Sequence, residues 1–135
     1  MKYLVDANVL SEPTRPSPSN KVVDWLSANE ELLVVDPIIL GELRIGILSL
    51  APGRKRTKLE QWFAALANTI ECLSWDYAIG LRWARLVADL RSKGKTMPVL
   101  DSLVAATALA HQLTIATHNV RHFKHAGVKV FDPFD

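Results

Sequence analysis

The chain has 135 residues, of which 49% are hydrophobic and 22% are charged, and its formal net charge at pH 7 is +2. This size and composition indicate one soluble globular domain, residues 1–135, that buries a core without disulfides or structural metal. They exclude a membrane span, because no segment approaches the ~20 uninterrupted apolar residues that a span needs. The apolar start is too short for a signal peptide and the single Cys72 has no partner for an internal disulfide, so we expect a cytoplasmic protein without a membrane partner.

Apolar runs typical of strands alternate along the chain with longer segments of helical period. The strand candidates are residues 3–5, 32–35, 70–73, 114–117 and 128–131. The predicted helices are residues 21–29, 37–50, 56–68, 75–94 and 99–112. Their start signals are Asn20, Asp36 with Pro37, Ser74 and Pro98, and their stop signals are Pro52 with Gly53 and Gly94.

Strands separated by helices of this length predict parallel pairing with right-handed crossover connections. The expected fold class is therefore α/β, a three-layer domain with a central parallel sheet flanked by helices. The segment 11–19 contains three prolines, and we expect a rigid extended link there rather than a boundary between domains.

Two polar residues directly follow strand candidates. Asp6 ends the first candidate, and Asn119 comes just after the fourth. In open parallel sheets the ligand site lies beyond the carboxyl ends of the strands, so we expect both side chains to converge on one crevice. For Asp6 alone, an Asx-turn leading out of the strand is an equally good explanation.

Two further acids stand beside apolar residues in predicted helices. Glu42 adjoins the apolar face of the helix 37–50, with no Lys or Arg four residues away to pair with it. Asp101 falls in the first turn of the helix that Pro98 opens, among mostly apolar neighbours. Taken singly, Glu42 is explained as a partly exposed helix residue, and Asp101 as an acid that meets the helix dipole or caps free N–H groups.

Together, Asp6, Glu42 and Asp101 indicate a metal site, because neighbouring carboxylates raise each other's pKa unless a cation neutralises them. Oxygen ligands suit Mg²⁺, and Mn²⁺ accepts the same ligand set. An ion that binds phosphate oxygens and activates water describes metal-assisted phosphodiester hydrolysis. Setting these three acids apart leaves 11 acids against 16 Lys and Arg, an excess that suits a polyanionic partner but is also common in small soluble proteins.

Three stretches make the chain resemble the PIN-domain ribonucleases, in particular the toxins of the VapC and FitB kind from bacterial toxin–antitoxin operons. VDANVLSEPTRP, from residue 5, resembles the opening strand and first acid of that family. LGELRIGI, from residue 40, resembles the helix with the second acid. PVLDSLVAATALAHQLTIATHNVRHF, from residue 98, resembles the third acid, the following strand and the fourth site position. The resemblance covers nearly the whole chain.

This resemblance implies an endoribonuclease dependent on Mg²⁺ or Mn²⁺, in which Asp6, Glu42 and Asp101 are catalytic residues that hold metal and water. A metal-activated water is expected to hydrolyse the RNA backbone and leave 5′-phosphate and 3′-hydroxyl ends. The expected partners are an RNA substrate, an antitoxin that covers the site, a second copy of the chain in a homodimer, and operator DNA only through the antitoxin. Asn8 is expected to orient the Asp6 loop, and Thr117 to hold a water or a carboxylate.

Asn119 departs from the family, which often has Asp at this fourth catalytic position. Its amide can coordinate through the carbonyl oxygen or hydrogen-bond a ligand, but it removes one negative charge from the site. We therefore expect one firmly bound ion, with any second ion arriving alongside the substrate.

Basic and aromatic residues have less specific explanations. Arg54, Lys55 and Arg56 cluster at a helix start, where they either bind an RNA backbone or face water. The spacing of His118, His122 and His125 would form a zinc face on a helix, but their segment is short and expected to be irregular, and no Cys joins it. The tryptophans lie on apolar helical faces, where burial explains them without base stacking.

Two other functions remain open from the sequence. One is a catalytically silent PIN-fold module that binds nucleic acid, although an unused carboxylate cluster would cost it stability. The other is a phosphohydrolase of the haloacid dehalogenase kind, which also ends its first strand with a catalytic Asp. Such enzymes need a second Asp two residues later, where this chain has Asn8.

Overall fold

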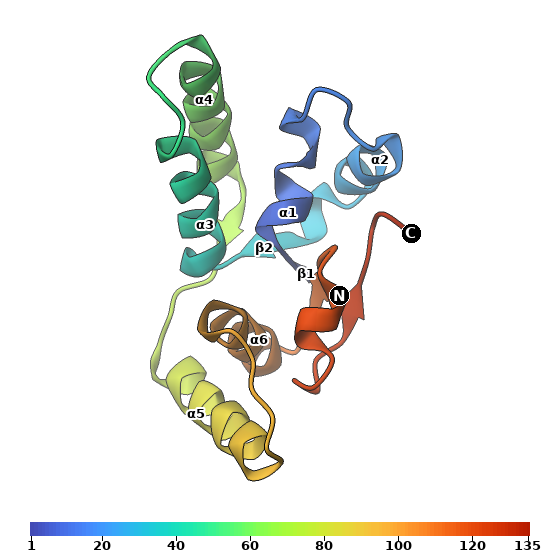
Figure 1. Ribbon diagram of the computed structural model, residues 1–135. Helices are drawn as coiled ribbons and strands as arrows, with labels where there is room; N and C mark the ends of the chain where they lie inside the picture. Colours follow the sequence, from blue (N-terminus) through green and yellow to red (C-terminus); the bar gives the residue numbers. More distant parts are fainter.

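A computed structural model, which describes residues 1–135, has a central parallel sheet flanked by six helices (Figure 1). The strands are β1 (Tyr3–Val5), β2 (Leu33–Val35), β3 (Glu71–Cys72), β4 (Thr114–Ala116) and β5 (Val130–Phe131). They pair in the order β3-β2-β1-β4-β5, and every pair is parallel. The α/β class predicted from the alternating pattern is therefore confirmed.

The helices are α1 (Ala7–Leu10), α2 (Asn20–Ala28), α3 (Pro37–Leu48), α4 (Arg54–Thr69), α5 (Tyr77–Ser92) and α6 (Val99–His111). Three short 3₁₀ turns join them, η1 (Glu12–Thr14), η2 (Glu30–Leu32) and η3 (Val120–Phe123). Helices α3 and α4 pack as one pair and α5 and α6 as another, and in Figure 1 the sheet lies to the right of both pairs, with α1 beside α3. No helix is both long and apolar enough to cross a membrane.

The centre of the sheet is also the centre of the core. Leu4 and Val5 of β1, Val34 of β2 and Ile115 of β4 are almost completely shielded from solvent. In β1, Leu4 pairs with Val34 on one side and with Ile115 on the other. From β1 the chain adds β2 and β3 on one side and then returns to add β4 and β5 on the other. The carboxyl ends of β1 and β4 thus mark the topological switch point, where open α/β sheets bind their ligands.

Two predicted helix starts were displaced. Ser19, rather than Asn20, caps α2, with its hydroxyl accepting from the backbone N–H of Val22 at 3.3 Å. Asp76, rather than Ser74, caps α5 through the N–H of Ile79 at 3.1 Å. Both caps are extended residues one position before the first helical turn, the geometry that lets a short side chain reach back to the free N–H groups.

Other boundaries differ as well. Helix α3 ends at Leu48, several residues before the predicted stop at Pro52, and the short helix α1 was not predicted. The link 11–19 is not simply extended, because it contains η1. It is fixed by the buried Glu12, whose carboxylate accepts from the Ser19 N–H at 2.8 Å. The buried Glu12 therefore holds the link against the fold, and the spacing of the prolines gives no sign of this contact.

Candidate active site

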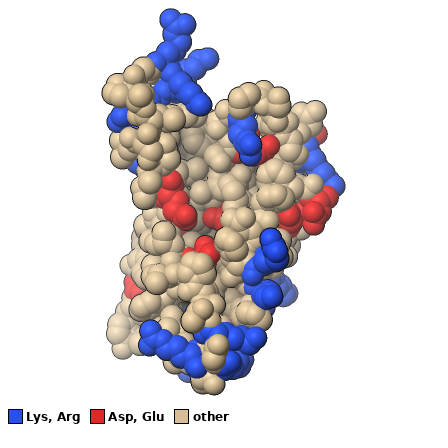
Figure 2. All heavy atoms as spheres, viewed as in Figure 1, with Lys and Arg blue, Asp and Glu red and all other residues tan.

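An open cleft of about 580 Å³ lies at the carboxyl edge of the sheet, beside the ends of β1 and β4. In Figure 2, acidic atoms gather in the middle of the face shown, between basic atoms at its two ends. The cleft brings together all four predicted catalytic residues, Asp6, Glu42, Asp101 and Asn119. Its other lining residues are Ala7, Asn8, Pro98, Val99, Leu100 and His122.

Asp6 is held in place more firmly than the other acids. It directly follows β1, is only 7% exposed, and caps α1 by accepting from the Ala7 N–H at 2.9 Å through Oδ1. Its second oxygen, Oδ2, accepts from the Thr117 hydroxyl at 2.8 Å and from the Asn8 amide at 3.2 Å. Because donors from two parts of the chain fix both oxygens, the direction of this carboxylate is set before any ligand arrives.

Asn8 and Thr117 join the two central strand ends. The Asn8 amide nitrogen lies 3.3 Å from Thr117 Oγ1, and its oxygen accepts from the backbone N–H of His118 at 3.0 Å. The fully buried Thr117 also accepts from the backbone N–H of Asn119 at 3.0 Å. The orienting role predicted for Asn8 and Thr117 therefore has a geometric counterpart in these bonds.

Glu42 enters the cleft from α3 with no hydrogen-bond or ion-pair partner. Burial raises the pKa of its carboxyl, and the negative charges of Asp6, Asp101 and Asp36 raise it further. The ionised form of an acid that is both half-buried and repelled by neighbouring negative charges is unfavourable in the protein without metal. Such a group gains most from a cation in the cleft.

Asp101 enters from the first turn of α6 and faces His122 of η3. The His122 Nδ1 lies 3.1 Å from Asp101 Oδ2. Burial raises the pKa of Asp101, whereas His122 opposes that rise and Asp6 adds to it. His122 was not predicted as a site residue, because only the turn of η3 brings it back over the cleft.

The three histidines do not share one face. His118 pairs with Asp132 at 3.1 Å, His122 faces Asp101, and His125 lies among Lys93, Lys95 and Lys124.

The predicted basic cluster at residues 54–56 is divided between bound and exposed side chains. Arg56 is bound within the fold, to Glu60 at 3.0 Å and to the Leu50 carbonyl at 3.2 Å. Arg54 and Lys55 are exposed at the start of α4, outside the acidic cleft.

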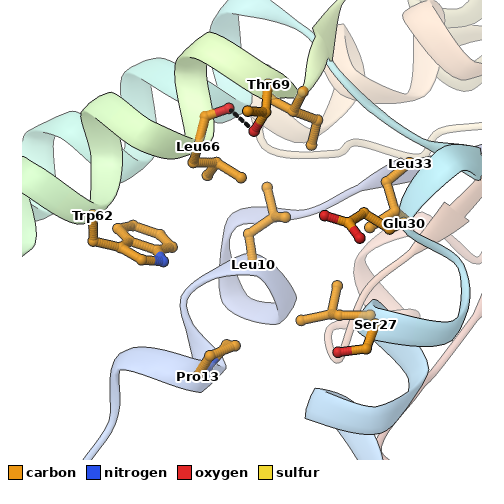
Figure 3. Close-up of a pocket in the computed structure, with 10 residues that line it drawn as sticks. Leu10, Pro13, Ser27, Glu30, Leu33, Trp62, Leu66 and Thr69 are labelled. Carbon is orange, nitrogen blue, oxygen red and sulfur yellow. Dashed lines mark hydrogen bonds between the residues drawn. The ribbon is translucent and has the colours of Figure 1, made fainter.

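A second hollow, of about 240 Å³, is mainly apolar and lies between α1, α2 and α4 (Figure 3). Leu10, Trp62 and Leu66 contribute side chains to it, and Glu30 adds a carboxylate (Figure 3). Its lining shares no residue with the acidic cleft. It therefore suits an apolar ligand rather than a phosphate.

The acidic cleft fits a divalent cation of a particular kind. No three side chains of His, Cys, Asp or Glu stand close enough together to enclose a metal ion by themselves. The charges of Asp6 and Asp101 nevertheless both act on Glu42, and the cleft offers only oxygen donors apart from His122. An open oxygen site of this type suits Mg²⁺, which is typically bound by one or two carboxylates and keeps several waters.

The sequence matches the family model described as "PIN domain" over residues 3–129. It is 37% identical to "Toxin FitB" of Neisseria gonorrhoeae, with 97% of each chain covered. It is 32% identical to "VapC ribonuclease Y4jK" of Sinorhizobium fredii, covering 98% of this chain and 97% of the relative.

Two solved structures have the same fold over nearly the whole chain. The crystal structure of FitAcB from Neisseria gonorrhoeae superimposes with a TM-score of 0.85 at 36% identity, covering 98% of both chains. A structure of FitAB bound to an IR36 DNA fragment gives a TM-score of 0.86 at 33% identity, covering 98% of this chain and 96% of the other.

Proposed function

The chain belongs to the PIN-domain family and has VapC and FitB toxins as relatives, and on that premise we propose that it is a metal-dependent endoribonuclease, the toxin of a toxin–antitoxin pair. The observation that carries the proposal is the convergence of Asp6, Glu42 and Asp101 on one cleft at the switch point of the sheet. We propose a cytoplasmic location as well, because the proposed substrate is RNA.

Asp6, Glu42 and Asp101 would hold Mg²⁺ together, partly through waters that the ion keeps, and Mn²⁺ can substitute for it. When bound, the ion supplies neutralisation of carboxylate and phosphate charge and lowers the pKa of water. The protein's own part is positioning. Thr117 and Asn8 keep Asp6 aimed into the cleft, and the turn of η3 places His122 against Asp101. Preorganised oxygens of this kind avoid the cost of reorienting during the reaction.

Purified protein should cut end-labelled structured RNA, including a tRNA pool, with Mn²⁺ and not with EDTA. Asp101→Asn should lower the rate by about 100-fold or more, because it removes a charged oxygen donor while keeping the shape of the side chain. Gel analysis of the fragments measures both effects. Equal inactivity of the wild type and the variant, with RNA binding retained, would instead favour a catalytically silent binding module.

Because Asn119 is a neutral amide, the site has one carboxylate fewer than a site with Asp at this position. We therefore expect one firmly bound ion per chain. Titration calorimetry with Mn²⁺ should give a stoichiometry of one for the wild type. Asn119→Asp should bind Mn²⁺ about tenfold more tightly, or take up a second ion, and should melt at a lower temperature without metal because a fourth carboxylate adds repulsion. Two equally tight ions in the wild type would refute this expectation.

The apolar hollow of Figure 3 is the surface that we assign to the antitoxin. It adjoins the same helix, α1, that Asp6 caps, so a segment seated there lies just across α1 from the cleft. Apolar side chains would fill it, and a basic residue would meet Glu30 at its edge. Operator DNA would be contacted through the antitoxin, a proposal supported by the relative's complex named FitAB with DNA.

Leu66→Asp should weaken antitoxin binding, because it places a charge in the apolar hollow. It should spare RNA cleavage, because Leu66 does not line the acidic cleft.

Exposed apolar side chains support a homodimer. Ile45 of α3 is 64% exposed, and Tyr77 and Leu81 of α5 are 81% and 55% exposed. Apolar surface of this kind commonly marks a protein interface. Light scattering should give twice the chain mass of 15.0 kDa, and a monomeric mass would contradict the assignment.

For RNA binding, the free members of the basic cluster are Arg54 and Lys55, since Arg56 already binds Glu60. Basic atoms lie at the same end of the molecule as the start of α4 (Figure 2). We propose that these two side chains contact the RNA backbone away from the cut. Glu at both positions should weaken RNA binding and reduce its salt dependence, without changing Mn²⁺ affinity.

A further inference from the structure

Gly46 is a glycine that the fold itself does not require. It lies in the last turns of α3, where glycine is unfavourable compared with alanine. Its backbone has no positive φ, and a Cβ built on it would meet no atom within 4 Å. Neither a turn nor a close approach of another segment within the chain therefore explains it. What the missing side chain leaves is open space.

That space belongs to a side cleft of about 240 Å³ next to the acidic cleft. Gly46 stands one helical turn after Glu42, on the same face of α3, and both residues line the side cleft. Ala7, Asn8 and Glu42 line both clefts, so the two are continuous. A chemical group that binds in the side cleft would therefore be close to the bond that the acids cleave, or part of the same ligand.

The walls of the side cleft differ in chemistry. Leu59 and Trp62 of α4 provide an apolar and aromatic wall, and Ser11 and Thr14 provide hydroxyl groups. Thr14 donates its hydroxyl hydrogen to the Ser11 carbonyl at 2.6 Å, which leaves its oxygen able to accept. The Ser11 hydroxyl makes no hydrogen bond in the fold, so it is available to a ligand, and Trp62 contributes its aromatic ring to the wall.

The charge of the side cleft excludes a phosphate group. No Lys or Arg lines it, and its one charged residue is Glu42. The group that fits is flat, neutral and polar at its edge. In an RNA bound with its backbone at the acids, that description matches a nucleobase, because single-stranded bases are recognised by stacking on aromatic side chains and by hydrogen bonds to their edges.

We propose that this side cleft binds the base of a nucleotide adjacent to the cleaved bond, and that Gly46, Trp62, Ser11 and Thr14 thereby set the sequence preference of cleavage. The inference rests on the proposed ribonuclease function and adds a specificity site to it. Trp62, which the sequence pattern assigned to burial alone, has a second role here, since it packs on the core and also faces the cleft.

The test compares Gly46→Leu with Gly41→Leu on an RNA library of random sequence, with the fragment ends sequenced. Gly41 is a matched control, because it is an exposed glycine of the same helix with open space around it and lines neither cleft. Gly46→Leu should raise KM about tenfold and flatten the base preference at one position beside the cut. Its melting temperature should equal or exceed the wild-type value, since leucine favours a helix more than glycine does, and its Mn²⁺ affinity should be unchanged because the acids are untouched.

Ser11→Ala is a second variant that removes a donor without blocking space. It should change the preferred base at the same single position and leave the melting temperature unchanged. Cleavage by Gly46→Leu with wild-type rate and preference would overturn the inference, as would wild-type cleavage with no base preference next to the cut. A wild type that does not cut RNA at all is a different result, the failure of the proposed function.

Discussion

Replacing Glu42 by Gln should abolish RNA cleavage and at the same time raise the melting temperature of the metal-free protein. Cleavage should fall about 100-fold or more, because a charged oxygen donor is lost from the metal site. The raised pKa of Glu42 means that its ionised form is less favourable in the fold than in the unfolded chain. The ionised carboxyl therefore costs stability at neutral pH, and neutral Gln removes that cost.

The gain in melting temperature should be small, roughly 1–3 °C, because Glu42 is only partly buried. Thermal unfolding in EDTA measures it. In Mn²⁺ the order should reverse, since the wild type binds the ion more tightly and gains more stability from it. Glu31→Gln is the matched control, because Glu31 is exposed and makes no hydrogen bond or ion pair. A metal-free Glu42→Gln variant less stable than the wild type would show that Glu42 supports the fold.

The convergence of the three acids on one cleft could be predicted from the sequence because their positions follow from rules of topology. A carboxylate at the end of a central parallel strand has to emerge at the carboxyl edge of the sheet, which is why Asp6 could be placed. Glu42 and Asp101 stood out as acids beside apolar neighbours on helices. Once the helices pack on the sheet, such positions point toward a shared cleft.

The contacts that tune the site were less predictable because they depend on side-chain geometry across long stretches of chain. His122 reaches Asp101 only through the turn of η3. Asp6 caps a helix of four residues that no periodic pattern can reveal. The side cleft at Gly46 was missed for a related reason, since open space beside a helix exists only after α1 and α4 are in place.

One buried contact links the two helices that carry Glu42 and Asp101. Asp36, the cap of α3, is fully buried and accepts from the Ile39 N–H at 3.0 Å and from the Thr107 hydroxyl of α6 at 2.8 Å. Glu42 lies six residues after Asp36, and Asp101 lies six residues before Thr107. The contact therefore fixes how α3 and α6 sit relative to each other, and with them the spacing of the two acids.

Thr107→Val should destabilise the protein by about 2–3 kcal/mol, because it leaves the buried carboxylate of Asp36 without one of its donors. The melting temperature should fall by roughly 6–12 °C. Thr107→Ser keeps the hydroxyl and removes only a buried methyl group, so it should cost only about 0.8 kcal/mol. Urea unfolding of both variants beside the wild type measures the difference.

The loss in Thr107→Val should also depend on pH. Burial already raises the pKa of Asp36, and removing a hydrogen bond to its charged form should raise that pKa further. The unfolded chain keeps the ordinary Asp value, so the added cost is fully present above the folded-state pKa and shrinks as the pH falls through it. The difference in unfolding free energy between the valine variant and the wild type should therefore narrow as the pH falls from neutral toward the ordinary Asp range, while the serine variant keeps a nearly constant difference. A valine variant whose gap stays constant over this range would mean that Thr107 contributes by packing rather than by stabilising the charge that holds α3 against α6.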